Sequence, residues 1–408
     1  MKATYATPKH TDLIADRDVM VPMRDGVRLA TDIVRPSLAD GQENVPLPVI
    51  MERTPYDKRG ISRSEVSVAE PQPASRVEIA EYFARRGFAV VMQDCRGRYN
   101  SEGEFHKYVN EAEDGYDTLE WLVEQPWCNG RVGTMGLSYG AHTQSALACL
   151  GPTGLSCMFM DSGGFSSAYH GGIRRGGAFE LKQATWAYRH ALRSPETLAD
   201  PTRAAKLKQK DIREWFRRMP WQPGASPLSA APEYEEYLFE EWRAGTFSDY
   251  WRQPGLYAEG FYDRFPDVPT AIVGSWYDPY VLTCLTNFVE LSKRHRSPTQ
   301  LIMGPWTHGD RSRTCAGDVD FGPDATLDNN LAPDYRELRL AWFRRWLQGA
   351  EEAGEQPNVR YFQMGGGSGL QDNAGKLSHG GCWKTAAEWP PPGTQENVLY
   401  LGGGGMLS

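Results

Sequence analysis

The chain has 408 residues, of which 40% are hydrophobic and 24% are charged, and its formal net charge is −8. This composition is ordinary for a globular protein with room for two or three domains, and the acidic balance argues against nucleic acid or an anionic membrane surface as a partner. No apolar run reaches the roughly 18 residues of a membrane-spanning helix, and the N-terminal segment lacks the apolar core of a secretory signal, so we expect a cytoplasmic protein.

The seven cysteines are scattered and form no C-x-x-C pair. Reduced thiols in a cytosolic protein are therefore favoured over a disulfide framework or a zinc site. The sequence also contains neither an H-E-x-x-H motif nor a glycine-rich phosphate loop, so we expect no metal and no cofactor.

The first part of the chain alternates strands and helices. The expected elements are a hairpin (18–36), a strand with its loop (47–58), a helix (76–88), a strand (88–97), a helix (111–127) and a strand (155–164). Such alternation predicts a parallel sheet with helices on both faces, which is the α/β class.

The segment Gly136-Leu137-Ser138-Tyr139-Gly140 matches the G-x-S-x-G pattern. An apolar stretch precedes it and an Ala- and Leu-rich stretch follows, which indicates a strand, a sharp turn and a helix. Glycines on both sides let strand and helix pass closely while the serine backbone is strained. We interpret Ser138 as a nucleophile; the alternative is a glycine-rich turn in a chain with 42 glycines.

The alternation stops after this half of the sheet. Residues 165–263 are helix-like, charged and rich in tryptophan and tyrosine, which predicts a helical cap inserted into the sheet domain. Most of these aromatic residues should pack between helices, and a few should line a pocket under the cap.

The sheet pattern then resumes and ends in a β-rich tail. The expected elements are a strand (267–280), a helix (282–295), a strand (299–310), a helix (334–349) and tail strands within 358–365, 381–393 and 397–401. The predicted division is core 1–164, cap 165–263, core 264–350 and β-tail 356–408. A tail of about fifty residues cannot bury a core of its own, so it is a truncated β-domain or a small β-appendage on the main domain.

A nucleophilic serine needs a base and an orienting acid, which in this fold type follow it in the order acid, then histidine. Asp278 and His308 each follow a sheet strand in that order, and Asp161 is the competing acid. The remaining histidines precede Asp278, end a helix or lie in the tail: His10, His106, His142, His170, His190, His295 and His379.

The oxyanion of an acyl-transfer reaction needs preorganised hydrogen-bond donors. The backbone N–H of Tyr139, directly after the nucleophile, is one candidate. The loop ERTPYDK has no glycine run that could supply a second amide, but it holds Tyr56, whose hydroxyl could donate. From the residues alone, a structural role for Tyr56 is equally open.

Several separate segments together resemble one family: MRDGVRLATDIVRP, RTPYDK, QDCRGRYNSEGEF, GRVGTMGLSYG, GSWYD and GPWTHG. They are similar to the cocaine-esterase/X-Pro dipeptidyl-peptidase (CocE/NonD) group of α/β-hydrolases. The resemblance implies an α/β-hydrolase domain with a helical cap and a C-terminal jelly-roll domain, of which this chain would hold only the start. It also implies a triad of Ser138, Asp278 and His308, and an oxyanion hole formed by the Tyr56 hydroxyl and the Tyr139 amide.

The expected function is that of a serine hydrolase that cleaves a small acyl ester or amide through an acyl-enzyme. The alternatives are an X-Pro dipeptidyl-peptidase or an α-amino-acid ester hydrolase, which need an acidic patch for the substrate amine. Cap glutamates such as Glu235, Glu236, Glu240 and Glu241 could supply that patch, although a solvated helix face is the plainer interpretation. A hydrolase-fold binding protein without turnover is a third hypothesis, and a homodimer is an open possibility for assembly.

Overall fold

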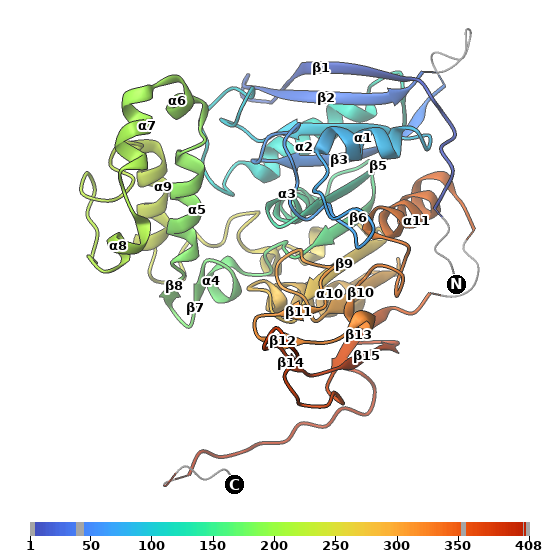
Figure 1. Ribbon diagram of the computed structural model, residues 1–408. Helices are drawn as coiled ribbons and strands as arrows, with labels where there is room; N and C mark the ends of the chain where they lie inside the picture. Colours follow the sequence, from blue (N-terminus) through green and yellow to red (C-terminus); the bar gives the residue numbers. More distant parts are fainter. Residues whose placement is uncertain (1–4, 38–44, 352–355, 403, 405–408) are drawn as a thin grey trace.

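A mostly parallel sheet forms the centre of the molecule in the computed structural model, which describes residues 5–37, 45–351, 356–402 and 404 (Figure 1). Within these residues the main sheet has ten strands in the order β1-β2-β4-β3-β5-β6-β9-β10-β13-β15. Neighbours from β4 to β13 pair in parallel, whereas β1, β2 and β15 pair antiparallel with their neighbours. The chain therefore has the α/β architecture that the alternating sequence pattern predicts.

The strands of this sheet are β1 (Leu13–Pro22), β2 (Arg28–Pro36), β3 (Leu47–Thr54), β4 (Ala89–Asp94), β5 (Cys128–Leu137), β6 (Leu155–Asp161), β9 (Thr270–Ser275), β10 (Thr299–Gly304), β13 (Val359–Met364) and β15 (Gly381–Ala386). The helices that cover it are α1 (Arg76–Ala84), α2 (Glu111–Val123), α3 (Tyr139–Ala148), α10 (Val281–Arg294) and α11 (Tyr335–Gln348).

The sheet is buried on both faces, which explains why its central strands are continuously apolar. On one face, side chains of α2, α3 and α10 such as Leu119, Leu147 and Phe288 pack into one apolar cluster. On the other face, α1 and α11 contribute Phe83 and Phe343 to a second cluster. The sheet thus forms a rigid middle layer whose strand ends can hold side chains in fixed positions.

Local capping interactions define where the covering helices begin and end. Ser75 and Glu78 form a capping box at the start of α1, in which each side chain bonds to the backbone amide of the other residue. The Asp334 side chain accepts from the Glu337 amide at the start of α11, and Gly349 ends that helix in the left-handed conformation. Gly349 is also the last residue of the helix expected at 334–349, and glycine adopts this conformation without strain.

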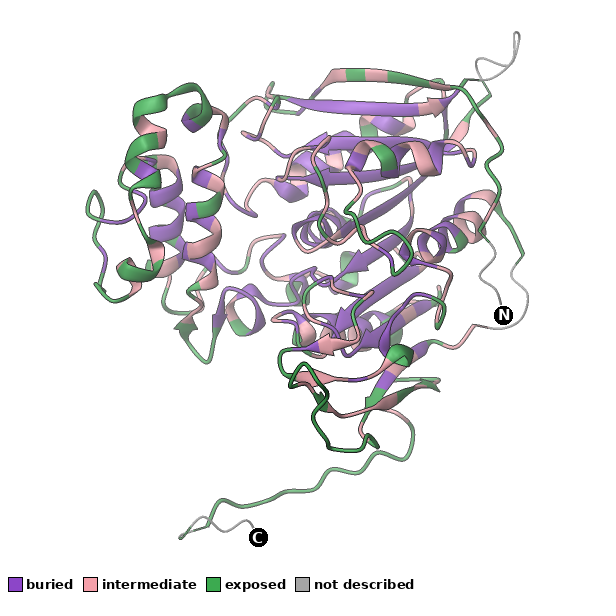
Figure 2. Ribbon diagram, in the orientation of Figure 1, coloured by how far each residue is buried: buried purple, intermediate pink, exposed green. Residues whose placement is uncertain are grey.

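A helical insertion between β6 and β9 lies beside the sheet and contacts the loops at one edge (Figure 1). It contains α4 (Ala168–Gly171), β7 (Arg174–Arg175), β8 (Ala178–Phe179), α5 (Lys182–Ala191), α6 (Pro195–Ala199), α7 (Pro201–Lys208), α8 (Ile212–Phe216) and α9 (Pro232–Arg243). Figure 2 shows the outer helices of this cap exposed and its inner surface buried. Most of its aromatic side chains, Trp251 and Tyr234 among them, pack into one cluster with core residues such as Tyr108 and Tyr139.

Short irregular elements follow the cap and β10. They are η1 (Ala258–Gly260), η2 (Tyr262–Arg264), β11 (Cys315–Ala316), β12 (Val319–Asp320), η3 (Pro323–Ala325) and β14 (Leu377–Ser378). Two-residue strands such as β11 and β12 carry too little periodicity to be predicted from sequence.

The tail strands join the main sheet. β13 pairs in parallel with β10, and β15 pairs antiparallel with β13, which is the arrangement of a β-appendage on the main domain. The strand expected at 397–401 does not form within the described residues; residues 397–400 are exposed and have no regular secondary structure, and Leu401 makes only a bridge. Residues 352–355, 403 and 405–408 lie outside the described residues, and the jelly-roll assignment stays a prediction. Within the described part of the chain, the helices are too short or too polar to cross a membrane.

The packing of α11 against β5 predicts the effect of Gly133→Ala. A β-carbon at Gly133 would lie 2.9 Å from Sγ of Cys157 and 3.0 Å from side-chain carbons of Phe343 and Leu347. We expect the substitution to lower the free energy of unfolding by about 1–3 kcal/mol, because an overfilled core must shift its neighbours. Urea unfolding followed by circular dichroism measures this. Gly245→Ala is the control, since its nearest neighbour is 3.7 Å away; equal effects of the two substitutions would contradict the packing argument.

Candidate active site

Four candidate side chains follow the carboxyl ends of neighbouring strands. Tyr56 lies two residues after β3, Ser138 directly follows β5, Asp278 follows β9 and His308 follows β10. Because parallel strands present their carboxyl ends at one edge of the sheet, ligands of such sheets bind there. The structure therefore brings all four residues to the edge that the cap covers.

The backbone at Ser138 is strained. Its φ of 60° and ψ of −114° lie outside the regions that L-residues ordinarily adopt. A β-carbon at Gly136 would lie 2.8 Å from the backbone of Gly140, and one at Gly163 would lie 2.5 Å from the carbonyl oxygen of Ser138. Only glycine fits at these positions, so the sharp strand-to-helix turn predicted from the motif is formed.

His308 and Asp278 form a close pair. The Nδ1 atom of His308 lies 2.6 Å from Oδ2 of Asp278, and the other carboxylate oxygen accepts a hydrogen bond of 2.7 Å from the Tyr280 amide. The two loops are tied together by hydrogen bonds from the Trp276 amide to the Gly304 carbonyl and from the Tyr277 amide to the Trp306 carbonyl. The Asp278 side chain is 1% exposed and that of His308 is 35% exposed, so a buried acid orients an accessible imidazole.

Asp161, the competing acid, has a different partner. Its Oδ2 atom lies 2.5 Å from Nη1 of Arg311, and both side chains are buried. Asp161 therefore neutralises a buried cation, and the geometry favours Asp278 as the partner of His308.

His308 lies beside the turn that carries Ser138. A β-carbon at Gly309 would lie 2.9 Å from Cδ1 of Leu137, the residue before Ser138. The hydrogen bonds among the described residues do not include one between Ser138 and His308. Hydrogen bonds of a catalytic site are often long before a substrate binds. The lack of this bond is therefore compatible with proton transfer from Ser138 to His308.

The Tyr56 hydroxyl also lies close to Ser138. It accepts a hydrogen bond of 3.2 Å from Nε1 of Trp186 in the cap helix α5. Burial raises the pKa of the Tyr56 phenol, and hydrogen bonding with Trp186 and Ser138 opposes this rise. A phenol that stays protonated and already accepts from Trp186 has its own proton available to donate beside Ser138.

The Tyr139 amide is the first N–H of α3, where amides have no acceptor within the helix. The Ser138 carbonyl accepts from the amides of Ala141 and His142, which closes the first turn. The Tyr139 N–H is thus one of the groups at the positive end of the helix dipole, which favours a developing negative charge.

The four cap glutamates do not converge. Glu236 and Glu240 are exposed, and Glu235 is held by the Ser226 hydroxyl and the Gly224 amide. Only Glu241 is buried without a hydrogen-bond partner, and burial raises its pKa to about 7. The ammonium of Lys107 influences the same carboxyl group and lowers its pKa.

Sequence reasoning missed several residues that hold the site together. Arg98 donates through Nε to the Pro55 carbonyl, next to Tyr56, and through its guanidinium to the Tyr234 hydroxyl of the cap. Lys107 is buried, with Nζ 4.4 Å from the centre of the Trp186 ring. Arg98 lies in the segment QDCRGRYNSEGEF, which carries part of the family resemblance, and Lys107 follows that segment by two residues. Nothing in the sequence there reveals which cap residues the two side chains contact.

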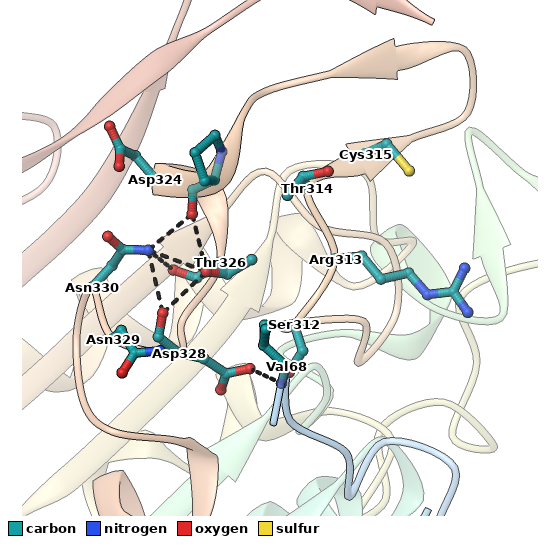
Figure 3. A pocket seen from close by; sticks show the side chains of 11 residues that line it. Val68, Ser312, Arg313, Thr314, Cys315, Asp324, Thr326, Asp328, Asn329 and Asn330 are labelled. Atoms are coloured by element: carbon teal, nitrogen blue, oxygen red, sulfur yellow. Dashed lines mark hydrogen bonds between the residues drawn. The ribbon is translucent and has the colours of Figure 1, made fainter. Parts of the chain in front are cut away.

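A cavity of about 680 Å³ lies elsewhere, between the loops after β10 and the loop that contains Val68 (Figure 3). Its lining includes Ser312, Thr326, Asp328 and Asn330, and none of the four candidate side chains. Among the residues that the structure describes, no group of three or more His, Cys, Asp or Glu side chains is placed to hold a metal ion.

Comparison with protein families finds two matches. Residues 25–310 match the model described as X-Pro dipeptidyl-peptidase (S15 family), and residues 352–408 match the X-Pro dipeptidyl-peptidase C-terminal non-catalytic domain. The cocaine esterase of Rhodococcus sp. (strain MB1 Bresler) is 32% identical over 406 residues, which cover 96% of this chain and 63% of that protein.

Solved structures show the same fold. A CocE/NonD family hydrolase from Staphylococcus aureus superimposes with a TM-score of 0.65 at 20% identity, covering 96% of this chain and 59% of that one. An α-amino-acid ester hydrolase gives a TM-score of 0.63 at 22% identity, covering 100% and 64%. The predicted α/β-hydrolase fold is thus confirmed, and the chain spans about 60% of the length of the relatives it matches.

The two acids differ in the loss of stability that we expect when each is neutralised. Asp161→Asn removes the charge that neutralises buried Arg311, so we expect the free energy of unfolding to fall by about 3 kcal/mol. Asp278→Asn should change it by less than about 1 kcal/mol, because its partner His308 is partly exposed to solvent. Urea unfolding of both variants at pH 7 measures the difference. Equal losses would contradict the assignment of Asp161 to a structural ion pair.

Proposed function

Because the chain belongs to the X-Pro dipeptidyl-peptidase (S15) family, we propose that it is a serine hydrolase that cleaves a small acyl ester through an acyl-enzyme. The resemblance of the sequence motifs to the CocE/NonD group is confirmed by the same match and by the cocaine-esterase relative. The observation that carries the proposal is the His308–Asp278 pair, which lies at the same sheet edge as Ser138 and the Tyr56 hydroxyl.

In the first half of the reaction, Oγ of Ser138 attacks the carbonyl carbon of the ester and its proton passes to Nε2 of His308. Asp278 accepts from the Nδ1–H of the imidazole and stabilises the imidazolium. The carbonyl oxygen becomes an oxyanion that accepts hydrogen bonds from the Tyr56 hydroxyl and the Tyr139 amide. Each such donor contributes on the order of 3 kcal/mol to the stability of the transition state.

In the second half, the tetrahedral intermediate collapses and the alcohol leaves with the proton from His308. A water molecule then gives a proton to His308 and attacks the acyl-enzyme carbonyl, so that the carboxylic acid is released and Ser138 regains its proton. The same two oxyanion donors serve both halves.

An ester substrate is favoured over an X-Pro peptide by the surroundings of the cap glutamates. A free substrate amine needs converging carboxylates, whereas only Glu241 of the four is buried without a hydrogen-bond partner, and its carboxyl interacts with the Lys107 ammonium. X-Pro dipeptidyl-peptidase and α-amino-acid ester hydrolase activity remain the alternative hypotheses. The His308–Asp278 pair at the same sheet edge as Ser138 argues against a non-catalytic binding protein.

We assign the catalytic unit to residues 1–164 and 264–350, the cap to 165–263 and a non-catalytic β-domain, of jelly-roll type in the family, to 356–408. A small acyl ester is the proposed substrate. A cytoplasmic location is a further prediction, which cell fractionation can check. A homodimer is another, which a measurement of the molecular mass in solution can check.

Ser138→Ala tests the nucleophile. With p-nitrophenyl butyrate as substrate we expect kcat to fall by a factor on the order of 10⁴ to 10⁶, because the attacking oxygen is gone while the fold is kept. Ala-Pro-p-nitroanilide, assayed in parallel, should be cleaved far more slowly than the ester by the unmodified chain. Labelling by a fluorophosphonate should also be lost in the variant. Near-normal turnover would place the nucleophile elsewhere, and anilide cleavage that requires a free N-terminus would favour the peptidase alternative.

Tyr56→Phe tests the second oxyanion donor. We expect kcat to fall by about 10² to 10³ with a small change in KM, because the hydroxyl is needed only when the oxyanion forms. The control is Tyr188→Phe, which removes a cap hydroxyl that donates to the carbonyls of Leu207 and Lys210. An unchanged kcat in Tyr56→Phe would return this residue to a purely structural role.

A further inference from the structure

The side chain of Tyr139 is held by two hydrogen bonds at its hydroxyl, far from its own backbone amide. The hydroxyl donates to Oε1 of Glu111 at 2.8 Å and accepts from the Tyr108 amide at 2.9 Å. The Tyr139 ring also stacks on the Tyr108 ring, with centroids 4.6 Å apart. Since the amide of the same residue is a proposed oxyanion donor, these contacts determine where that amide points.

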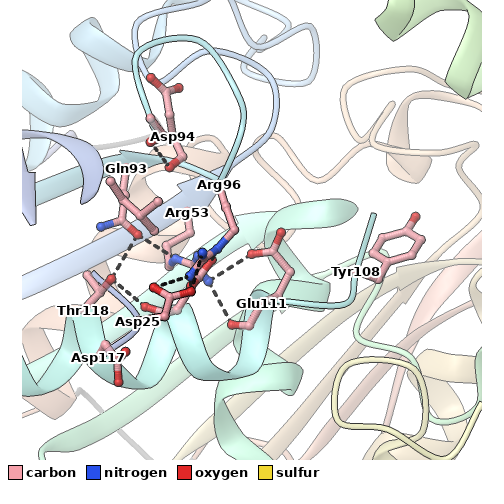
Figure 4. Close-up of polar contacts among 12 residues, drawn as sticks. Asp25, Arg53, Gln93, Asp94, Arg96, Tyr108, Glu111, Asp117 and Thr118 are labelled. Carbon is pink, nitrogen blue, oxygen red and sulfur yellow. Dashed lines mark hydrogen bonds and ion pairs between the residues drawn. The ribbon is translucent and has the colours of Figure 1, made fainter. Parts of the chain in front are cut away.

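Glu111 is in turn held by Arg53, as Figure 4 shows. The Nη1 atom of Arg53 lies 3.0 Å from Oε2 of Glu111 and donates to its backbone carbonyl at 2.9 Å. The two side chains are 2% and 5% exposed. Burial raises the pKa of the Glu111 carboxyl, and the adjacent Arg53 guanidinium opposes this rise. Glu111 therefore presents one oxygen to Arg53 and the other to the Tyr139 hydroxyl.

Arg53 is itself immobilised. Its Nε donates to Oε1 of Gln93 at 2.7 Å, and its Nη1 would lie 3.3 Å from a β-carbon at Gly115 of α2. A glycine inside a helix is unfavourable by roughly 0.5–1 kcal/mol relative to alanine, so its presence here needs a reason. The reason is space: a β-carbon at this position would crowd the Arg53 guanidinium and also the side chain of Leu147.

Arg53 also lies near the end of the strand that leads to the other proposed donor. It lies in β3, three residues before Tyr56. Arg53 is thus part of the segment that leads to Tyr56, and its guanidinium pairs with the Glu111 carboxylate that accepts from the Tyr139 hydroxyl.

We propose that Glu111 and Arg53 are positioning residues of the oxyanion hole, which fix the Tyr139 amide relative to the Tyr56 hydroxyl through the Tyr139 side chain. This inference rests on the serine-hydrolase function proposed for the chain. It assigns a role in the transition state to a buried ion pair that touches neither the substrate nor the nucleophile.

The direct test is Tyr139→Phe, which deletes the tether and keeps the amide. We expect kcat for p-nitrophenyl butyrate to fall about tenfold with KM within about twofold, since one hydrogen bond of ordinary strength corresponds to such a factor. The affinity for phenylboronic acid, which forms a tetrahedral adduct with a catalytic serine, should fall by a similar factor. The control is Tyr82→Phe, which removes a phenol hydroxyl bonded to Glu337 at 2.5 Å, away from the site, and should change neither quantity.

A second pair of variants keeps the proposal testable if Tyr139→Phe is unstable at the assay temperature. Glu111→Asp keeps the charge but withdraws the carboxylate by one methylene, and should lower kcat and boronic acid affinity in the same way. Glu111→Gln keeps an acceptor at full reach, and should stay within about threefold of the unmodified chain. Circular dichroism at the assay temperature establishes which variants are folded.

The outcomes separate the positioning role from the proposed function. Unchanged kcat and boronic acid affinity in folded Tyr139→Phe, or in folded Glu111→Asp, would overturn the positioning role and leave the hydrolase proposal intact. A raised KM with unchanged boronic acid affinity would likewise indicate a general structural role and overturn it. An unmodified chain that neither hydrolyses the ester nor binds the boronic acid would overturn the proposed function and, with it, the positioning role.

Discussion

The turn at Ser138 is the constraint on which the arrangement of the site depends. The serine backbone has a positive φ, and such strain persists only where the surrounding structure over-determines it. The end of β5, the start of α3 and the loop after β6 all meet at this turn, and the Ser138 amide donates to the Asp161 carbonyl at 2.8 Å. The serine hydroxyl is consequently placed at the sheet edge by three elements at once, and the remaining groups of the site have only to be aimed at it.

Buried ion pairs flank the loop that carries the Tyr56 hydroxyl and restrict its position. The loop with Tyr56 lies between two of them, because Arg53 before it pairs with Glu111 and Lys58 after it pairs with Asp94 at 2.7 Å. A buried pair adds little net stability, since the desolvation of both charges offsets their attraction, but removing one partner leaves an expensive unpaired charge. The pairs around this site are therefore better understood as fixing geometry than as holding the fold together.

Much of this arrangement could be predicted from the sequence, because the order of the elements along the chain determines which strand ends meet. Asp278 and His308 follow neighbouring parallel strands, and the structure pairs them at 2.6 Å. The surroundings of the Tyr56 hydroxyl could not be predicted from spacing, since its hydrogen-bond partner Trp186 lies in the cap, 130 residues away. The partners of Arg53 and Glu111 escaped prediction for the same reason. The joining of β13 to the main sheet was also out of reach, because an alternating pattern does not specify which edge a strand will pair with.

The space left by Gly115 in α2 limits which stabilising substitutions this chain can accept. Helix propensity alone recommends alanine at an internal helix glycine, and substitutions of this kind are a common route to heat resistance. Here the added methyl group would press on Arg53 and on the Cβ of Leu147 at 3.2 Å. A substitution chosen to stabilise the helix would therefore press on the guanidinium that, in our proposal, positions the oxyanion donors. A gain in thermal stability at Gly115 is then expected to come with a loss of turnover.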